Sequence, residues 1–200
     1  FKPSDNIIDS VSKNVRDQYE ENPYPRWRYT YKIQPIDFFD ALKLEIVPNK
    51  VERDNKFINP NILVAGCGTG HHPILSSRFK NANLLAVDLS LKSLAFAKRK
   101  TLELGIKNID FLHEDILQLK KQNIKFDIIE SVGTLHHMKY PIEGLKVLLD
   151  ILKPNGFMKL GLYSKIARQH IVIIKDFIKQ KNLKNTNEDI KIIRQLIFNE

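Results

Sequence analysis

Short apolar runs alternate with helix-like patterns through the middle of the chain. Each run is bounded by polar or glycine-containing segments, as is typical of strands buried in a parallel sheet. The expected strands are residues 61–65, 83–88, 109–112, 126–131 and 157–163. The expected helices are residues 73–79, a segment that Ser90 can cap and Gly105 can end, and residues 141–152. This alternation predicts an α/β fold with a doubly wound, mostly parallel sheet and helices on both faces.

The first part of the chain is not strand-like. Residues 4–20 predict an amphipathic helix with Ile7, Ile8, Val11 and Val15 on one face. A segment rich in proline and aromatic residues follows at 22–27 and interrupts the helix. A short helix over residues 35–44 is expected next, and a charged linker after it.

The end of the chain also follows helical spacing. Residues 165–181 predict one helix, and Thr186 resembles the capping residue of a second. The whole pattern therefore predicts three parts: an N-terminal helical and aromatic cap over 1–56, the α/β core over 57–164, and a helical segment over 165–200.

Composition narrows the class of protein. The net charge of +9 comes mostly from scattered lysines, whereas arginine, which reads phosphates and bases better, is scarce. Nucleic acid is therefore a possible partner but not the favoured one. No apolar run approaches the roughly 20 residues that a membrane span needs, so no membrane association is expected.

The chain has one cysteine, Cys67, which indicates a reducing, cytoplasmic setting. Because Cys67 lies inside a glycine loop with no evident base, we expect it to fill space rather than to act as a nucleophile. The chain begins at Phe1 without an apolar leader, and we expect it to be a piece of something longer.

The candidate chemistry lies at the ends of the first three expected strands. The loop Gly66-Cys67-Gly68-Thr69-Gly70 follows the first strand, and such glycines bring backbone N–H groups close to a ligand. Asp88 ends the second strand, where a carboxylate can accept the hydroxyls of a ribose. Asp115 follows the third strand and can accept from an adenine amino group. Together they predict a nucleoside site at the carboxyl edge of the sheet.

These segments resemble the class I S-adenosylmethionine-dependent methyltransferases, in the order and spacing of that family. The matching segments are Leu63 to Gly70, Ala86 to Ser90, Glu114 to Ile116, Phe126 to His137, and Leu152 to Phe157. The resemblance implies a Rossmann-like fold and S-adenosylmethionine as cofactor, with S-adenosylhomocysteine as product. It also implies that the cofactor is bound by Ala65, Gly66, Cys67, Gly68, Gly70, Asp88, Leu89, Glu114, Asp115, Ile116 and Ser131.

The reaction implied is direct displacement of the methyl group from a sulfonium by an unidentified acceptor. A small molecule is favoured as acceptor, and a protein is the other class considered. Because the sulfonium is already activated, positioning and desolvation are expected to dominate, with a base needed only for an acceptor that must lose a proton. His136 is the candidate for that base, and Arg26 is the candidate for binding the methionine carboxylate.

Several alternatives stay open at this point. A nicotinamide dinucleotide site is one alternative, and such sites prefer the pattern G-x-G-x-x-G. The third glycine of this chain, Gly70, comes one residue before the position that this pattern requires, which disfavours such a site. The histidine pairs 71–72 and 136–137 could approach each other, but no further ligand type supports a metal site there. Trp27, Tyr24 and Tyr29 could fill the core or cover the cofactor. A non-catalytic module that binds the cofactor, or only a partner, is the alternative function.

A looser resemblance concerns domains attached to tetratricopeptide repeat proteins. It rests on Tyr24-Pro25-Arg26-Trp27 and on the stretch from Ser164 to Arg168. It implies that the full chain is fused to tetratricopeptide repeats. The chain departs from the methyltransferase pattern in one respect, because no sixth or seventh strand is evident before Glu200.

Overall fold

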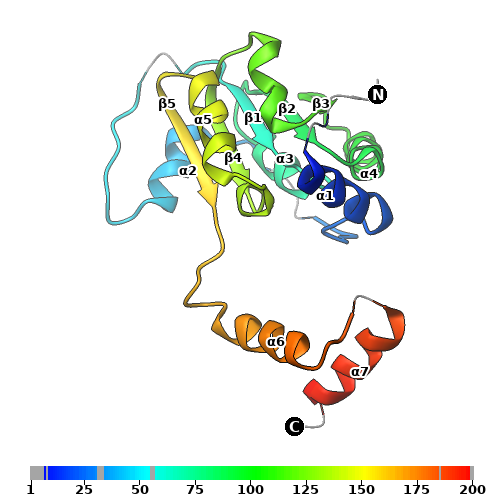
Figure 1. The fold of residues 1–200 in the computed structure, drawn as a ribbon. Coiled ribbons are helices and arrows are strands. Elements are labelled where there is room, and N and C mark those ends of the chain that lie inside the picture. Colours follow the sequence, from blue (N-terminus) through cyan, green and yellow to red (C-terminus); the bar gives the residue numbers. More distant parts are fainter. Residues whose placement is uncertain (1–6, 8, 31–33, 55–56, 185, 199–200) are drawn as a thin grey trace. The chain divides into compact units, whose positions relative to one another are not determined.

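The computed structural model describes residues 7, 9–30, 34–54, 57–184 and 186–198. The chain divides into two compact units, residues 1–162 and residues 163–200. The predicted α/β fold is confirmed in the first unit, where helices cover both faces of a central sheet (Figure 1).

The central sheet has five strands, all parallel, in the order β3-β2-β1-β4-β5. The strands are β1 Asn61–Ala65, β2 Asn83–Asp88, β3 Ile109–His113, β4 Phe126–Val132 and β5 Leu152–Gly161. Because the chain moves outward from β1 first toward β3 and then toward β5, the order reverses beside β1. The connections after β1 and β4 therefore lead to helices on opposite faces, and ligands of doubly wound sheets bind at the strand ends beside such a reversal.

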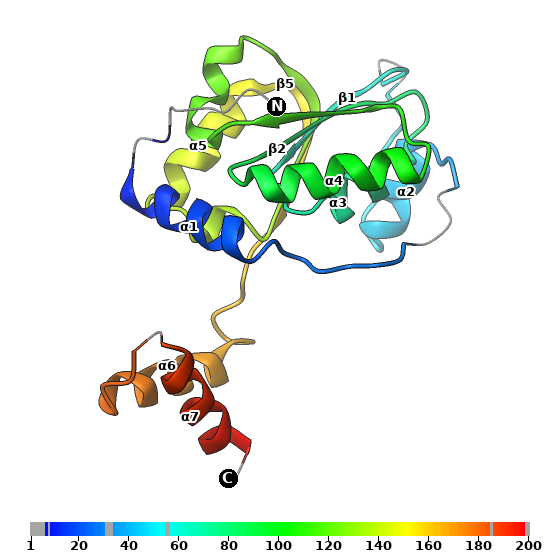
Figure 2. The same cartoon turned by 90° about the vertical axis from the view of Figure 1, so that its right-hand side faces the viewer.

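Apolar side chains alternate between the two faces of the sheet. Different helices lie on these two faces (Figure 2). One face packs against α2 Phe38–Glu45, α3 His71–Ser76 and α4 Leu91–Glu103. The other face packs against the 3-10 helix η1 Ile116–Gln122 and α5 Pro141–Ile151. The central strand β1 is buried on both faces, which explains its uninterrupted apolar sequence.

Phenylalanines form the densest part of the first face. Phe38 and Phe39 of α2 contact Phe57, Phe79 and Phe157, with ring centroids between 5.3 and 6.0 Å apart. The cluster joins α2, the helix before β1, to the edge strand β5 on the same face of the sheet, so the N-terminal part of the chain packs into the core of the first unit.

The first helix is shorter than predicted. Helix α1 spans Ser10–Glu21, because the carboxylate of Asp9 accepts hydrogen bonds from the N–H groups of Val11 and Ser12 and so caps its first turn. Of the apolar face predicted for this helix, Ile7 precedes it as a buried residue, and Ile8 lies outside the described residues.

The last strand also differs from the prediction. The turn expected at Lys153-Pro154-Asn155-Gly156 is part of β5, which begins at Leu152 and ends at Gly161 rather than at Tyr163. Pairing with β4 is interrupted by a register shift between Phe126 and Ile128, and Asn155 has a positive φ of 62°. Residues 153–156 therefore do depart from regular strand geometry, but they form an irregularity within β5 and not a turn before it.

The second unit contains α6 Gln169–Gln180 and α7 Asn187–Phe198. The N–H of Asp189 donates to Oγ1 of Thr186, as the predicted cap requires. Among the described residues after Gly161, none forms a strand. None of the helices in the described ranges combines the length and apolar character that a bilayer crossing needs.

Substitution of Phe39 tests the phenylalanine cluster. Phe39 is 2% exposed, so Phe39→Ala should lower the free energy of unfolding by about 3–5 kcal/mol, through lost burial and the cavity left behind. Urea denaturation monitored by circular dichroism measures this change. Leu44→Ala is the matched control on the same helix, because Leu44 is 75% exposed and its loss should change stability by less than about 0.5 kcal/mol. Equal losses in both variants would contradict the packing described.

Candidate functional site

The glycine loop is held at the junction of two strand ends. The N–H groups of Gly66 and Cys67 both donate to the carbonyl oxygen of Val87, at 2.8 and 2.9 Å. This pair of bonds folds the loop back over the end of β2. Gly70 then precedes α3, so the loop leads directly from β1 into a helix, as the sequence predicts.

Gly66 is required by a close approach from the loop after β4. Its φ is +78°, and a Cβ atom at this position would lie 2.1 Å from Oγ1 of Thr134. Oγ1 of Thr134 donates to the carbonyl of Gly66, and Oγ of Ser131 donates to the carbonyl of Ala65. The ends of β1 and β4 are thus joined by side chains of β4 and its loop.

Asp88 connects the glycine loop to the end of β2. Its Oδ2 accepts a hydrogen bond of 2.7 Å from the N–H of Gly68, and its Oδ1 accepts one of 2.9 Å from the N–H of Ser90. Burial raises the pKa of the Asp88 carboxyl above its usual value, although these N–H groups act in the opposite direction. Each further hydrogen-bond donor would therefore stabilise the ionised form of Asp88.

The third strand end supplies two more carboxylates. Oε1 of Glu114 accepts from the N–H of Asp115, and Oδ1 of Asp115 accepts from the N–H of Leu117. Asp115 is only 2% exposed, and burial raises its pKa while Leu117 and the Ser12 hydroxyl lower it. Ser12 of helix α1 therefore lies near Asp115.

The proline- and aromatic-rich segment packs directly on the glycine loop. The carbonyl of Tyr24 accepts from the N–H of Thr69 at 3.3 Å, and the carbonyl of Pro25 accepts from the Thr69 hydroxyl at 2.5 Å. Nε1 of Trp27 donates to the carbonyl of Thr69 at 3.2 Å, and its ring lies against His71 and Phe96. Trp27 therefore packs on the core, which is one of the two roles considered for it.

The neighbouring side chains of this segment point outward. Tyr24 is 65% exposed and Tyr29 is 88% exposed. Arg26 is exposed too, and its guanidinium lies 3.4 Å from Oδ1 of Asn22. In this conformation, the backbone of residues 24–25 and the ring of Trp27 cover the loop, while Arg26 lies on the surface.

The remaining predicted residues are near the loop but differ in exposure. Cys67 is buried in the first-face core, and burial followed by the charge of Asp88 raises the pKa of its thiol, which agrees with a space-filling role. Ile116 is buried in the other core, and Ser131 is fully buried. Leu89 is partly exposed, and its carbonyl oxygen lies 2.8 Å from Nε2 of His113.

The two histidine pairs are engaged in different contacts. His72 contacts Glu130 of β4, with 3.0 Å between Nε2 and Oε2, and the ring of His136 packs on that of His137 with centroids 4.4 Å apart. Burial would raise the pKa of Glu130, but the interactions with His72 and Ser76 hold it below its usual value. Within the described ranges, no group of three or more histidine, cysteine, aspartate or glutamate residues is arranged to hold a metal ion.

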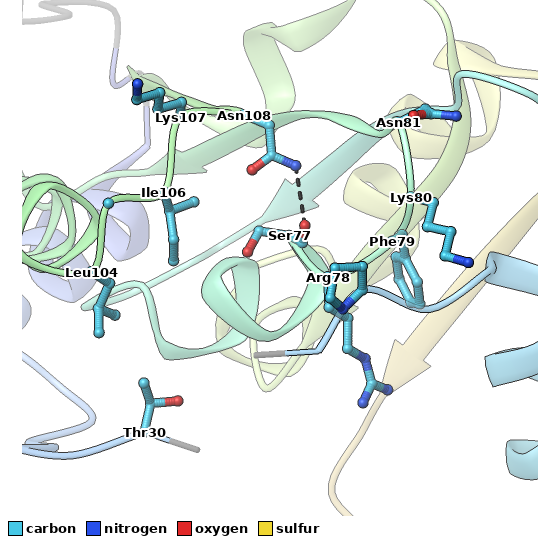
Figure 3. Close-up of a pocket in the computed structure, with 12 residues that line it drawn as sticks. Thr30, Ser77, Arg78, Phe79, Lys80, Asn81, Leu104, Ile106, Lys107 and Asn108 are labelled. Carbon is cyan, nitrogen blue, oxygen red and sulfur yellow. Dashed lines mark hydrogen bonds between the residues drawn. The ribbon is translucent and has the colours of Figure 1, made fainter. Parts of the chain in front are cut away.

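A cavity of about 730 Å³ lies beside the amino ends of β2 and β3, away from the glycine loop (Figure 3). Its walls include Arg78 at the end of α3, and Lys107 and Asn108 just before β3. The side-chain amide of Asn108 donates to the carbonyl of Ser77 and closes one side. Because helices α3 and α4 both end here, basic side chains are favoured by the helix carbonyls, and the cavity is separate from the predicted site.

Residues 62–156 match the family model of the methyltransferase domain. This range contains the glycine loop, Asp88, Asp115 and the strand β4, in the arrangement described above. The chain belongs to the class I S-adenosylmethionine-dependent methyltransferases. The cofactor of this methyltransferase family is S-adenosylmethionine.

Similar proteins extend the match beyond the domain. An uncharacterised protein of Synechococcus sp. is 34% identical over 82% of this chain and 40% of its own length. The ubiquinone biosynthesis O-methyltransferase of Dechloromonas aromatica is 24% identical over 89% of this chain and 75% of its own length. The chain therefore spans well under half of the first of these relatives.

Solved structures share the methyltransferase fold. PKMT2 from Rickettsia typhi, solved in complex with AdoHcy, superposes with a TM-score of 0.58. It is 22% identical, and the match covers 69% of this chain and 28% of that chain. This likeness supports the sheet order and the helices on both faces.

Sequence reasoning did not single out Glu130 or Thr134. Glu130 has a signal, because it is a carboxylate within the otherwise apolar run of β4. Thr134 has none, since its contact with Gly66 depends on how two loops from different strands meet. Neither contact follows from spacing along the chain.

Substitution of Gly68 tests the packing of the N-terminal segment on the loop. Gly68 has a φ of +52°, and a Cβ atom would lie 2.5 Å from the carbonyl oxygen of Tyr24. We expect Gly68→Ala to displace this segment and to shift the fluorescence emission of Trp27, the single tryptophan of the chain, to longer wavelength.

Gly105→Ala is the matched control for this change. Gly105 also has a positive φ, +68°, but nothing lies within 4 Å of its added Cβ. Both variants should lose about 1–2 kcal/mol from backbone strain, and only Gly68→Ala should alter the Trp27 emission of the folded protein. The described contact is wrong if the two variants have the same emission spectrum.

Proposed function

We propose that the chain binds S-adenosylmethionine across the carboxyl ends of β1, β2 and β3 and transfers its methyl group to an oxygen atom of a small molecule. The observation that carries this proposal is the bond between Gly68 and Asp88, which joins a bare-backbone loop to a carboxylate at the next strand end. The proposal assigns cofactor contacts to Ala65, Gly66, Cys67, Gly68, Gly70, Asp88, Leu89, Glu114, Asp115, Ile116, Ser131 and Arg26.

Asp88 fits the ribose of the cofactor. Each carboxylate oxygen already accepts one backbone N–H and has a further lone pair for a hydroxyl. Because burial disfavours the ionised form of Asp88, hydrogen bonds from two ribose hydroxyls would stabilise it. The buried Asp88 carboxylate requires hydrogen-bond donors, and the ribose hydroxyls of the cofactor are such donors.

The adenine end of the proposed site involves α1. Asp115 can accept an amino group of the ligand, while Ile116 offers an apolar contact. The hydroxyl of Ser12 in α1 lies near Asp115 but donates to Oδ2 of Asp9 at 2.7 Å, which leaves Asp115 able to accept from a ligand.

The methyl group of the bound sulfonium is electrophilic, and the chain contributes by positioning and desolvation. Relatives named as ubiquinone biosynthesis O-methyltransferases favour a small molecule with a hydroxyl group as acceptor. An oxygen acceptor must lose a proton, which calls for a base near the methyl group. From the sequence, His136 is one candidate for this base.

The setting of the reaction is part of the same proposal. A single buried cysteine favours a reducing, cytoplasmic compartment. The resemblance of Tyr24 to Trp27 and of Ser164 to Arg168 to domains attached to tetratricopeptide repeat proteins favours a fused repeat array in the full protein. Mass spectrometry of the native protein would test both the fusion and the state of Cys67.

Calorimetric titration with S-adenosylhomocysteine tests the cofactor site. Asp88→Ala should weaken binding at least about 30-fold, because it removes charged acceptors worth about 1.5–3 kcal/mol each. Asp110→Ala is the control, since Asp110 is an exposed aspartate on the neighbouring strand β3 and should bind as the parent does. Absence of binding by the parent chain would contradict the proposal. Binding without methyl transfer to catechol, used as a small hydroxyl probe, would favour a non-catalytic module.

A further inference from the structure

A carboxylate is buried in the strand beside the glycine loop. Glu130 is 4% exposed and lies in β4 between Ile129 and Ser131. Its Oε2 accepts a hydrogen bond of 2.5 Å from the hydroxyl of Ser76 and lies 3.0 Å from Nε2 of His72. An ionised carboxylate can only accept, so this geometry fixes the His72 tautomer with a proton on Nε2.

The other ring nitrogen of His72 is left with its lone pair. The side chain of His72 is 30% exposed, so its outer edge can be reached from solvent. Within the described residues, no hydrogen bond joins Nδ1 of His72 to another group. A histidine held on one nitrogen by a buried carboxylate, with the other nitrogen accessible, has the arrangement of an oriented general base.

The fold puts this histidine at the carboxyl edge of the sheet. His72 is the second residue of α3, which begins directly after the glycine loop. Glu130 immediately precedes Ser131, whose hydroxyl donates to the carbonyl of Ala65 at the end of β1. The pair therefore lies beside the junction of β1 and β4, where the strand order reverses.

A purely structural role explains Glu130 less well. The charge of Lys159 of β5 also acts on Glu130, but Lys159 is paired with Glu45 of α2 at 2.6 Å, so its charge is shared. A buried carboxylate in a strand costs desolvation energy that an apolar residue would avoid. Besides the hydroxyl of Ser76, the described group that gains a defined orientation from Glu130 is the imidazole of His72.

We propose that His72 is the general base that deprotonates the acceptor, and that Glu130 is the residue that positions it. This inference rests on the proposed function. His72 takes the proton of the acceptor hydroxyl on Nδ1 while the acceptor oxygen forms its bond to the methyl carbon. The sulfur keeps the electron pair of the broken carbon–sulfur bond, so the products are a methyl ether, S-adenosylhomocysteine and a protonated imidazole.

The first test needs no acceptor. The chain labelled with ¹⁵N-histidine is titrated with S-adenosylmethionine and with S-adenosylhomocysteine, which differ at the sulfur by one methyl group and one positive charge. The Nδ1 signal of His72 should differ between the two complexes, and that of His170 in α6, an exposed histidine, should be the same in both. Identical His72 signals in the two complexes would overturn the proposal.

The second test separates chemistry from binding, with catechol as the probe acceptor. His72→Gln keeps an amide N–H that can donate to Glu130 but removes the basic nitrogen, and it should lower kcat at least about 100-fold. Its affinity for S-adenosylhomocysteine should stay within about twofold of the parent, because His72 is not assigned to the cofactor contacts. Glu130→Gln should lower kcat and weaken the tautomer preference of His72 in the same spectra.

Ser76→Ala is the matched control, since it removes the other partner of the same Glu130 oxygen while leaving His72 in place. Comparable loss of kcat in Ser76→Ala and His72→Gln, or a His72→Gln variant within about threefold of the parent, would overturn the base assignment. If the parent fails to bind S-adenosylhomocysteine, the proposed function itself fails. If it binds but leaves catechol unmethylated, the histidine spectra decide the inference.

Discussion

The hydrogen bond from Gly68 to Asp88 is the contact on which the rest of the candidate site depends. It ties the loop after β1 to the end of β2 at 2.7 Å and orients the remaining lone pairs of the carboxylate. The same loop donates two N–H groups to the carbonyl of Val87, and the hydroxyl of Thr134 donates to the carbonyl of Gly66. The ends of β1, β2 and β4 are thereby held in one geometry before any ligand is bound, so binding needs to order less of the chain.

The N-terminal part of the chain completes this arrangement. Tyr24, Pro25 and Trp27 contact the glycine loop, and Ser12 of α1 lies near Asp115. The loop is therefore supported by a segment about 40 residues away in sequence, which the family model over residues 62–156 does not include. Contacts of this kind make the N-terminal segment part of the candidate site.

Much of the core could be predicted from sequence because its signals are local. Strands β1 and β2 are bounded by glycine or aspartate and match the expected ranges, and Ser90 caps α4 as its spacing indicates. The errors have a physical cause in longer-range packing: Asp9 starts α1 later than the apolar spacing suggests, and pairing with β4 draws the turn at Asn155 into β5. The contact of His72 with Glu130 joins residues 58 positions apart, so neither motif spacing nor hydrophobic pattern contains it.

Hydrogen–deuterium exchange with and without S-adenosylhomocysteine tests the central claim most directly. A nucleoside held across the strand ends should slow exchange at the amides of residues 66–70, 88–90 and 113–117, while the cavity residues 104–108, away from the glycine loop, stay unchanged. Protection confined to these cavity residues, or none at the three strand ends under saturating ligand, would contradict the account.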